Sequence, residues 1–442
     1  MNQKSREGYV MKVFEYGRDE LNILYEQLKS RSIENRADIE ESVREILRGV
    51  KERGDAAVSE YTQKFDGVLI SPQELEVSAS EIEESLESAD KELLNVIKRA
   101  AENIRAFHER QKENSWFTTN QDGVVLGQKI TPLDRAGVYV PAGSAPLPST
   151  VLMNVIPAKV AGVREIVLCS PPDKSGRINP LILACAKIAG ADRVFKTGGA
   201  QAIGAMAYGT ESIPKVDKIV GPGNIYVATA KKLVFGICGI DMIAGPSEVL
   251  VIADETANPR YVAADLLSQA EHDAFASAIL VTTSKKIADE VNKELQIQLE
   301  KLPRKDIASK SVNNYGAIVI TGSIDQAVEI ANTIAPEHLE LCVEDPFSLL
   351  PSINNAGAIF LGNFSPEPLG DYYAGPNHTL PTSGTARFSS PLGVYDFVKR
   401  QSIISYSKKA FEKVSSDVAA FADAEGLTAH ANSIRIREDG GN

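Results

Sequence analysis

The sequence lacks several features that mark membrane, nucleic-acid-binding and secreted proteins. No apolar run approaches the roughly 18 residues that a membrane-spanning helix needs. Acidic side chains outnumber basic ones, and the net charge of −12 argues against nucleic acid, which requires a clustered cationic surface. The first 30 residues contain no apolar signal core and include Glu and Asp. We therefore expect neither a secretory nor a transit peptide, and a cytoplasmic location.

Cysteine is also sparse. The four cysteines, Cys169, Cys185, Cys238 and Cys342, show no C-x-x-C spacing, and three of them lie in strongly apolar runs. We predict small buried hydrophobic side chains in a reducing compartment, rather than a structural disulfide or a cysteine metal site. The G-x-G-x-x-G fingerprint of dinucleotide-binding domains is missing as well.

What the sequence does contain is a repeated alternation of strand and helix patterns. Short apolar strands alternate with helices between residues 137 and 234, and a second such series occupies residues 249–361. This alternation predicts parallel sheets covered by helices, and 442 residues exceed one ordinary core. We predict an α/β protein with two Rossmann-like parallel-sheet domains of similar architecture, a helical N-terminal segment and a small C-terminal tail.

Changes in sequence texture suggest the boundaries of these parts. The predicted division is a helical segment at 1–34, a first α/β domain at 35–138 plus 247–390, a second α/β domain at 139–246, and a tail at 391–442.

Glycine-rich polar loops follow three strands of the first α/β series. These loops carry Tyr139, Gln201 and Asn224. The carboxyl ends of parallel strands are where nucleotides bind, and glycines let a ligand approach the backbone closely. Ordinary turn chemistry accounts for the same residues, so the spacing alone leaves both interpretations open.

Four of the five histidines lie in the second half, each near another potential ligand or catalyst. Imidazole is the commonest zinc ligand and the side chain best suited to moving protons near neutral pH. The four groups are Gln269 with His272, Glu337 with His338, Asp371 with His378, and Glu425 with His430.

One subset of these residues has the donor chemistry of a zinc site. Gln269 and His272 are three residues apart on a predicted helix, so both side chains project from one face. Asp371 lies on a glycine-rich loop, and His430 offers a second imidazole. A His/His/Asp/Gln set suits a divalent ion, although helix capping, an Asx turn and tail packing explain the same residues.

A second subset suits proton transfer. Glu337 and His338 are adjacent, between a helix-breaking Pro336 and an apolar strand. A carboxylate and an imidazole in one buried place can divide acid and base work, whereas an exposed solvated pair would have no such role. Ser247 also directly precedes a strand, so we expect these groups and the Gln269 pair along the amino edge of the second sheet. His378 is either a loop-stabilising residue or a substrate contact.

Together, these segments resemble the histidinol dehydrogenase family over nearly the whole chain. The segments that carry the resemblance are G-V-Y-V-P-A-G-S-A-P-L-P-S-T at 137–150, G-G-A-Q-A-I at 198–203, G-P-G-N-I-Y-V-A-T-A-K at 221–231, A-G-P-S-E at 244–248, D-L-L-S-Q-A-E-H at 265–272, A-P-E-H-L-E at 335–340, G-D-Y-Y-A-G-P-N-H at 370–378 and L-T-A-H at 427–430.

The resemblance implies an NAD-dependent oxidation of L-histidinol, through bound L-histidinaldehyde, to L-histidine in the last step of histidine biosynthesis. It implies that His338 is the base and that Glu337 activates water. It further implies one zinc ion per subunit, held by Gln269, His272, Asp371 and His430. Substrate contacts would include these six residues with Ser247, His378 and Glu425, and NAD contacts would be Tyr139, Gln201 and Asn224.

The resemblance also implies a homodimer with shared active sites, in which the tail carrying Glu425 and His430 reaches the other subunit. Three rival functions remain: a related zinc- and NAD-dependent dehydrogenase of a sulfonated diol, a zinc hydrolase without a nucleotide, and a non-catalytic binding protein. The segment A-R-F-S-S-P-L-G-V-Y-D-F at 386–397 and the spacing of Glu425 from His430 look more like histidinol dehydrogenase.

Overall fold

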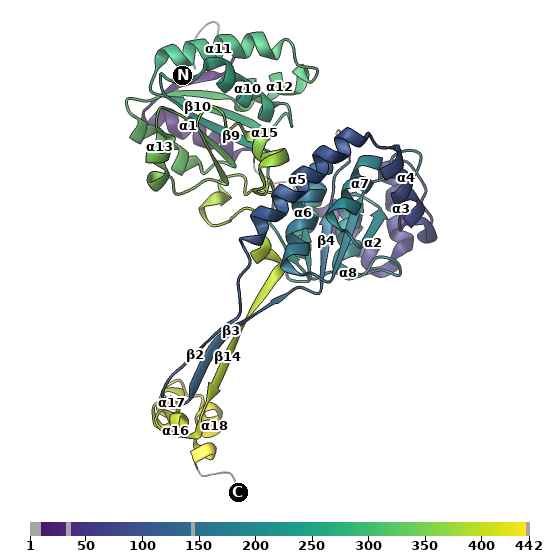
Figure 1. Ribbon diagram of the computed structural model, residues 1–442, viewed down its shortest axis with the longest axis vertical. Coiled ribbons are helices and arrows are strands. Elements are labelled where there is room, and N and C mark those ends of the chain that lie inside the picture. The colour runs from purple at the N-terminus through teal and green to yellow at the C-terminus, as the bar shows by residue number, and fades with distance from the viewer. Residues whose placement is uncertain (1–9, 32–36, 143–145, 439–442) are drawn as a thin grey trace. The chain divides into compact units, whose positions relative to one another are not determined.

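The computed structural model describes residues 10–31, 37–142 and 146–438. Its contacts divide the chain into two compact units, one of residues 1–111 with 133–397 and one of residues 112–132 with 398–442. The first unit contains two parallel sheets covered by helices, so the predicted α/β class with two Rossmann-like sheets is confirmed (Figure 1). Within the described ranges, no helix is long and apolar enough to cross a membrane.

A six-stranded parallel sheet carries most of the predicted catalytic residues. Its strands, in spatial order, are β1 (Lys12–Glu15), β11 (Ala317–Ile320), β10 (Ser277–Thr282), β9 (Glu248–Ala253), β12 (His338–Cys342) and β13 (Ala358–Leu361). Apolar cores lie on both faces of the sheet. One face packs against α10 (Pro259–Ala270), α11 (Lys285–Leu299) and α12 (Lys305–Tyr315), and the other against α1 (Arg18–Lys29) and α13 (Ile324–Ile334).

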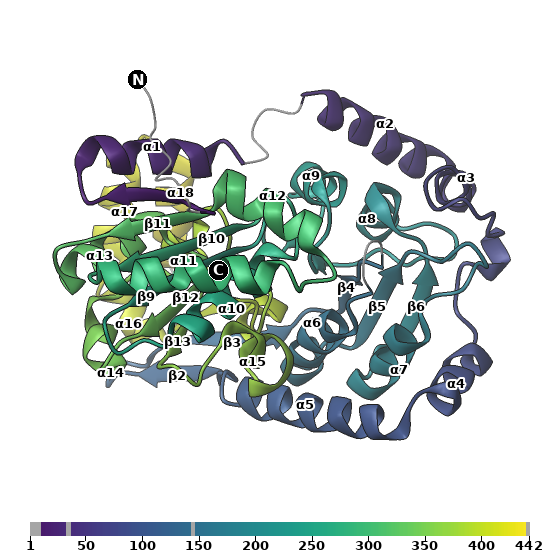
Figure 2. The ribbon, with the colours of Figure 1, turned by 90° about the horizontal axis from the view of Figure 1, so that it is seen from above.

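The second sheet has five parallel strands. They are β6 (Arg193–Lys196), β5 (Glu165–Ser170), β4 (Arg135–Tyr139), β7 (Lys218–Val220) and β8 (Gly239–Ile240), in spatial order. One face packs on α5 (Lys91–Glu109), α6 (Pro148–Ala161) and α7 (Pro180–Ala189). The other packs on α2 (Ala37–Arg53), α3 (Asp55–Asp66), α8 (Gly199–Tyr208) and α9 (Ile225–Val234) (Figure 2). A short helix, α4 (Ala79–Ser88), contacts α7.

Two parts of the chain differ from the predicted division. Residues 35–138 were expected with the six-stranded sheet, but the apolar faces of α2, α3 and α5 lie in the two cores of the five-stranded sheet. The N-terminal segment, expected to be helical, contributes strand β1 to the edge of the six-stranded sheet before α1 begins. Helical periodicity carries no information about which sheet a helical apolar face will cover.

The second unit is a small antiparallel sheet with three helices. The strands are β2 (Trp116–Thr119), β3 (Val124–Pro132) and β14 (Val398–Tyr406), and the helices are α16 (Lys408–Glu412), α17 (Ser415–Ala424) and α18 (Thr428–Glu438). The predicted tail comprises residues 391–442 alone. Instead β14 pairs along its whole length with β3, which precedes it by more than 260 residues. Such a long-range pairing leaves no signal in the tail sequence itself.

The structural candidate active site

The predicted catalytic pair stands at the start of β12, immediately after a sharp turn. Helix α13 ends at Ile334, and the next residue, Ala335, adopts a left-handed conformation with φ of 53°, unusual for a residue other than glycine. Pro336 then prevents further helix. The turn leaves Glu337 only 7% exposed and His338 only 2% exposed. The alternative interpretation, a solvated surface pair, is therefore wrong.

Glu248, the first residue of β9, contacts both members of this pair through its backbone. Its N–H donates to Glu337 Oε2 at 2.8 Å, and His338 Nδ1 lies 2.9 Å from its carbonyl oxygen. A carbonyl oxygen only accepts, so Nδ1 must carry the proton and donate it. His338 Nε2 is then left with a lone pair in the neutral ring. This nitrogen is buried without a hydrogen-bond partner among the described residues.

The buried carboxyl groups around His338 control its affinity for a proton. Burial lowers the pKa of His338, but the charges of Glu337, Asp371 and Glu367 raise it more, to about 10. Burial raises the pKa of the Glu337 carboxyl to about 8, partly offset by His338. Asp371 Oδ1 lies 3.7 Å from His338 Nε2. Without a metal, these charges favour the imidazolium form of His338 at neutral pH, and any cation bound among these carboxylates would favour the neutral imidazole.

Donor atoms suited to a metal converge beside this pair. Asp371 lies in the turn Gly370–Ala374. Although burial opposes it, interaction with His338 and His378 keeps the pKa of the Asp371 carboxyl well below its usual range. His272 is partly accessible to solvent, yet partial desolvation lowers its pKa. The charge of Asp371 raises the pKa of His272 and so opposes this effect. Asp371, His272 and His378 thus lie close enough to influence one another's charge.

Gln269 behaves as expected of a residue that awaits a ligand. It is 1% exposed on α10, and its Oε1 has no hydrogen-bond partner in the part of the chain that the structure describes. Buried amide oxygens are normally satisfied, so a partnerless one points to a missing donor or cation. The adjacent Ser268 donates to Glu367 Oε2 at 3.0 Å, which ties this end of α10 to the segment that precedes Asp371.

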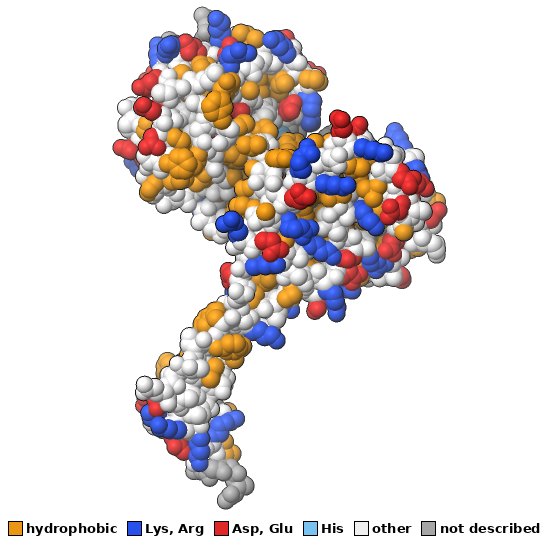
Figure 3. Space-filling view, in the orientation of Figure 1, with side chains coloured by type: hydrophobic (Ala, Val, Ile, Leu, Met, Phe, Trp, Pro, Cys, Tyr) orange, Lys and Arg blue, Asp and Glu red, His pale blue; other side chains and the backbone are white. Residues whose placement is uncertain are grey.

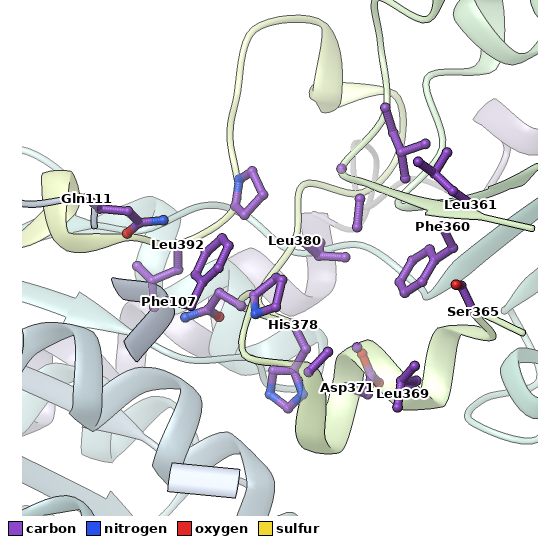
Figure 4. A pocket seen from close by; sticks show the side chains of 18 of the residues that line it. Phe107, Gln111, Phe360, Leu361, Ser365, Leu369, Asp371, His378, Leu380 and Leu392 are labelled. Atoms are coloured by element: carbon purple, nitrogen blue, oxygen red, sulfur yellow. The ribbon is translucent and has the colours of Figure 1, made fainter. Parts of the chain in front are cut away.

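A cavity of about 600 Å³ opens beside Asp371 and His378. Its wall is mostly apolar, including Phe107, Phe360 and Leu380, as Figure 4 shows. A mainly apolar recess with a few polar groups is the usual form of a small-molecule site. Sequence reasoning left open whether His378 stabilises a loop or contacts a ligand, and its place in this wall favours contact with a ligand.

The glycine-rich loops lie at the carboxyl end of the five-stranded sheet. Tyr139 ends β4, and its hydroxyl accepts the Gly199 N–H at 3.2 Å. Gln201, in the first turn of α8, is 1% exposed, yet both of its side-chain polar atoms lack partners within the described ranges. Asn224 caps α9, with Oδ1 accepting the N–H groups of Tyr226 and Val227, so only its amide nitrogen remains for a ligand.

Close backbone packing requires glycine at one of these loops. Gly221 has φ of 113°, and a Cβ at this position would lie 2.1 Å from the Tyr139 carbonyl oxygen. Lys231 forms a buried ion pair with Asp241, and the two side chains bind the Gly221 carbonyl and N–H at 2.9 and 2.8 Å. Thus the loop is rigidly held, and capping and ligand binding are compatible uses of Asn224.

Comparison with known proteins identifies the family of the chain. A sequence model of the histidinol dehydrogenase family matches residues 29–438. The chain belongs to the histidinol dehydrogenase family. The Bacillus subtilis histidinol dehydrogenase is 58% identical over 398 residues, 90% of this chain and 92% of that protein. The Aquifex aeolicus histidinol dehydrogenase is 56% identical over 419 residues, 95% and 97% of the two chains.

A solved structure gives the same assignment. The crystal structure of histidinol dehydrogenase from Elizabethkingia anophelis superimposes with a TM-score of 0.92 at 42% sequence identity, covering 98% of this chain and 99% of that one. Membership of the histidinol dehydrogenase family, predicted from the ordered motifs, is therefore confirmed, and the chain is a dehydrogenase.

The expected amino-edge placement holds for the residues of the six-stranded sheet. Strands β9 and β12 are parallel neighbours with His338 opposite Val249, so Ser247 and Glu337 both lie just before the edge. Ser247 is half-buried, and its carbonyl accepts the Ser277 N–H at 3.0 Å. His430 in α18 and Glu425 after α17 belong to the second unit, where both are exposed. Within a single chain, the first unit therefore supplies three of the four predicted metal ligands.

Glu367 is the residue that sequence reasoning missed. Ligand atoms of His338, Glu367 and Asp371 all lie within 4.8 Å of one another. Glu367 is 2% exposed, and burial, followed by the charge of Asp371, raises its pKa to about 8. A protonated Glu367 carboxyl can donate to Asp371 and orient it. The available signal was its position between two prolines, four residues before Asp371.

Proposed function

We propose that this enzyme oxidises L-histidinol to L-histidine in two NAD-dependent steps, with L-histidinaldehyde held between them. The observation that carries the proposal is the buried, partnerless Nε2 of His338, oriented by the Glu248 carbonyl and 3.7 Å from Asp371. An alcohol oxidation by hydride loss needs a base at the hydroxyl proton, and this nitrogen is the free lone pair at the site.

In the first oxidation, His338 Nε2 accepts the hydroxyl proton while the carbinol hydride leaves to the nicotinamide. The products are the aldehyde, NADH and one proton on the imidazole. The Nδ1–H bond to the Glu248 carbonyl keeps the ring in the required tautomer and orientation. The charges of Glu337 and Asp371 stabilise the imidazolium that forms.

In the second oxidation, Glu337 accepts a proton from water as the oxygen adds to the aldehyde carbon. The His338 imidazolium returns its proton to the former carbonyl oxygen, which gives the hydrate and a neutral imidazole. Its carboxyl pKa near 8 makes proton exchange at neutral pH feasible. His338 then takes a hydroxyl proton of the hydrate as the second hydride leaves. The carboxylate product, a second NADH and released protons complete the balance. The buried setting helps to retain the reactive aldehyde.

The donor set fits zinc. Gln269, with its partnerless buried Oε1, together with His272 and Asp371 would hold the ion, and His430 of the partner subunit would complete four ligands. When bound, zinc supplies orientation of the substrate through its amine and imidazole nitrogens. Glu367 and Ser268 keep Asp371 and the end of α10 in place.

NAD would bind at the carboxyl end of the five-stranded sheet. Tyr139, Gln201 and the Asn224 amide surround the glycine-rich loops there, and the N-terminus of α8 faces the pyrophosphate in this arrangement. The two partnerless polar atoms of Gln201 support a ligand at this position.

The homodimer with shared sites is part of the proposal. The second unit exposes large apolar side chains, as the lower part of Figure 3 shows. They include Trp116, Phe117, Ile404 and Phe421. Exposed apolar surface of this kind on a small unit favours a protein partner. Exposed Glu425 and His430 on the same unit are then available to the site of a second copy.

The four cysteines bear on location. All four are buried and unpaired. Unpaired buried thiols fit a reducing compartment, which supports the proposed cytoplasmic location.

The ratio of NADH formed to histidinol consumed tests the reaction. We expect two NADH per histidinol, and none with a sulfonated diol in place of histidinol. A ratio of one would contradict the second oxidation, and histidinol turnover without NADH would indicate hydrolytic chemistry instead.

Subunit mixing tests the shared site. His272→Ala and His430→Ala chains should each be inactive alone. Mixed one to one after reversible dissociation, they should recover about a quarter of wild-type activity, because half the dimers are mixed and each has one intact site of two. A mixture that stays inactive while native gels show mixed dimers would contradict sharing.

A further inference from the structure

Arg31 is a buried guanidinium at the end of the N-terminal segment. Its side chain is 2% exposed, and its Nη2 lies 2.5 Å from Glu248 Oε1. Nη1 donates to the Phe275 carbonyl at 3.0 Å, and Nε donates to the Leu28 carbonyl at 3.3 Å. The guanidinium also lies 5.7 Å from the centre of the Tyr315 ring. Arginine is almost never buried unless it is paired, so these contacts define one specific place for it.

The partner of Arg31 is the residue that holds both catalytic side chains. Glu248 bonds Glu337 through its N–H and His338 through its carbonyl, at 2.8 and 2.9 Å. Its own carboxylate is 5% exposed, and Oε2 has no hydrogen-bond partner among the residues described. Arg31 is therefore the cation that neutralises the buried carboxylate of Glu248, whose backbone contacts both proposed catalytic side chains.

We propose that Arg31 is a positioning residue of the catalytic centre, which neutralises Glu248 and fixes the Glu248 peptide between Glu337 and His338. Without Arg31, a second uncompensated carboxylate would stand beside Glu337 and would compete for its proton and for water. This inference rests on the proposed roles of Glu337 and His338.

The proposal also gives the N-terminal segment a function. Strand β1 pairs with β11 at the edge of the six-stranded sheet, and α1 returns along the sheet to place Arg31 near the amino ends of β9 and β10. The match to the family model begins at residue 29, just before Arg31. The segment thus supplies a charge to the active site as well as covering a sheet edge.

Three variants separate a positioning role from simple packing. In Arg31→Met, the Glu248 charge is left alone, and we expect kcat per folded enzyme to fall at least about tenfold, with KM for histidinol and NAD changed less than about threefold. Arg31→Met combined with Glu248→Gln removes both charges and should recover most of that loss. Arg31→Lys keeps the positive charge but loses the planar guanidinium with its several N–H donors, and it should give an intermediate kcat.

A control away from the site is the half-buried Arg135–Glu165 pair at the amino edge of the five-stranded sheet. Its nearest atoms are 2.6 Å apart, and it lies outside the catalytic and cofactor contacts. Arg135→Met should lower the melting temperature without lowering kcat. If Arg31 mattered only for packing, the double variant would be less active than Arg31→Met, because it loses more native contacts.

The experiment measures NADH formation at saturating substrates, normalised to the folded fraction from circular dichroism. An unchanged kcat in Arg31→Met, or a double variant no more active than the single one, would overturn the proposal. Should Arg31→Met fail to fold, the same comparison uses Arg31→Lys with and without Glu248→Gln. Failure of the proposed function is separate, because the wild-type enzyme would then produce no NADH from histidinol.

Discussion

The two parallel sheets present their proposed functional residues at opposite ends of their strands. In the five-stranded sheet, Tyr139 ends a strand, and Gln201 and Asn224 lie in or before the following helices. In the six-stranded sheet, Ser247 and Glu337 precede their strands and His338 begins one. Two sheets of the same architecture therefore place their proposed functional residues at opposite strand ends.

The difference follows from what each end of a strand offers. The carboxyl end is followed by helix N-termini, whose free N–H groups bind phosphate with neutral side chains. The amino end has no such groups, so titratable side chains must do the chemistry. Accordingly, the large pKa shifts of Glu337, His338 and Glu367 lie beside the six-stranded sheet. Changes at its amino edge should alter kcat, whereas changes at the other carboxyl edge should alter NAD binding.

The largest effect is expected at the base. His338→Asn keeps a donor toward the Glu248 carbonyl but removes the Nε2 lone pair, so kcat should fall about 10²–10⁴-fold. KM for NAD should change little, because the proposed NAD contacts belong to the other sheet. Steady-state NADH formation measures both, and calorimetry checks that the variant is folded. A kcat within threefold of wild type would show that another group is the base.

Two buried glutamines sharpen the comparison, one beside each sheet, and Gln269 should give the larger effect. Its partnerless Oε1 costs the ligand-free protein stability, so Gln269→Leu should stabilise the zinc-free enzyme by about 1 kcal/mol. The same change should weaken zinc at least about tenfold and lower activity with it. Zinc titration and urea unfolding measure the two quantities. Zinc affinity equal to wild type would exclude Gln269 as a ligand.

Family membership and the alternating fold were predictable because they depend on local patterns. Ordered motifs and strand-helix alternation lie within short segments, and the family match and both parallel sheets confirm them. The amino-edge positions followed from one local fact, that Glu337 comes directly before an apolar strand.

What could not be predicted depends on long-range packing. The pairing of β14 with β3 and the packing of α2 on the five-stranded sheet join segments far apart in the chain. Arg31 and Glu367 escaped notice for the same reason, since their partners, Glu248 at 217 residues away and Ser268 at 99, are distant in sequence. A charged residue becomes informative only once its burial is known.

A smaller effect is expected at Gln201. Gln201→Met removes two partnerless buried polar atoms, so the NAD-free enzyme should become more stable by about 1 kcal/mol or more. NAD binding should weaken about tenfold, with zinc content and kcat at saturating NAD close to wild type. Calorimetric NAD titration and thermal unfolding test this. A parallel loss of zinc would contradict the separation of the two sheets into cofactor and metal sides.

A gradual effect is expected for the pH dependence of stability that Glu337 confers on the zinc-free enzyme. Burial raises its pKa from 4.5 to about 8, so between these values the folded state holds a proton that the unfolded state has lost. Stability must then fall as pH rises through this window, by at most about 1.4 kcal/mol per pH unit.

The Glu337→Gln variant tests this expectation, because its side chain cannot ionise and its amide oxygen can still accept the Glu248 N–H. The free energy of unfolding of Glu337→Gln relative to wild type, from urea titrations at pH 5 to 9, should therefore increase up to about pH 8 and then level off. A difference that stays constant over this range would contradict this prediction, because it would show that Glu337 is already ionised in the folded enzyme.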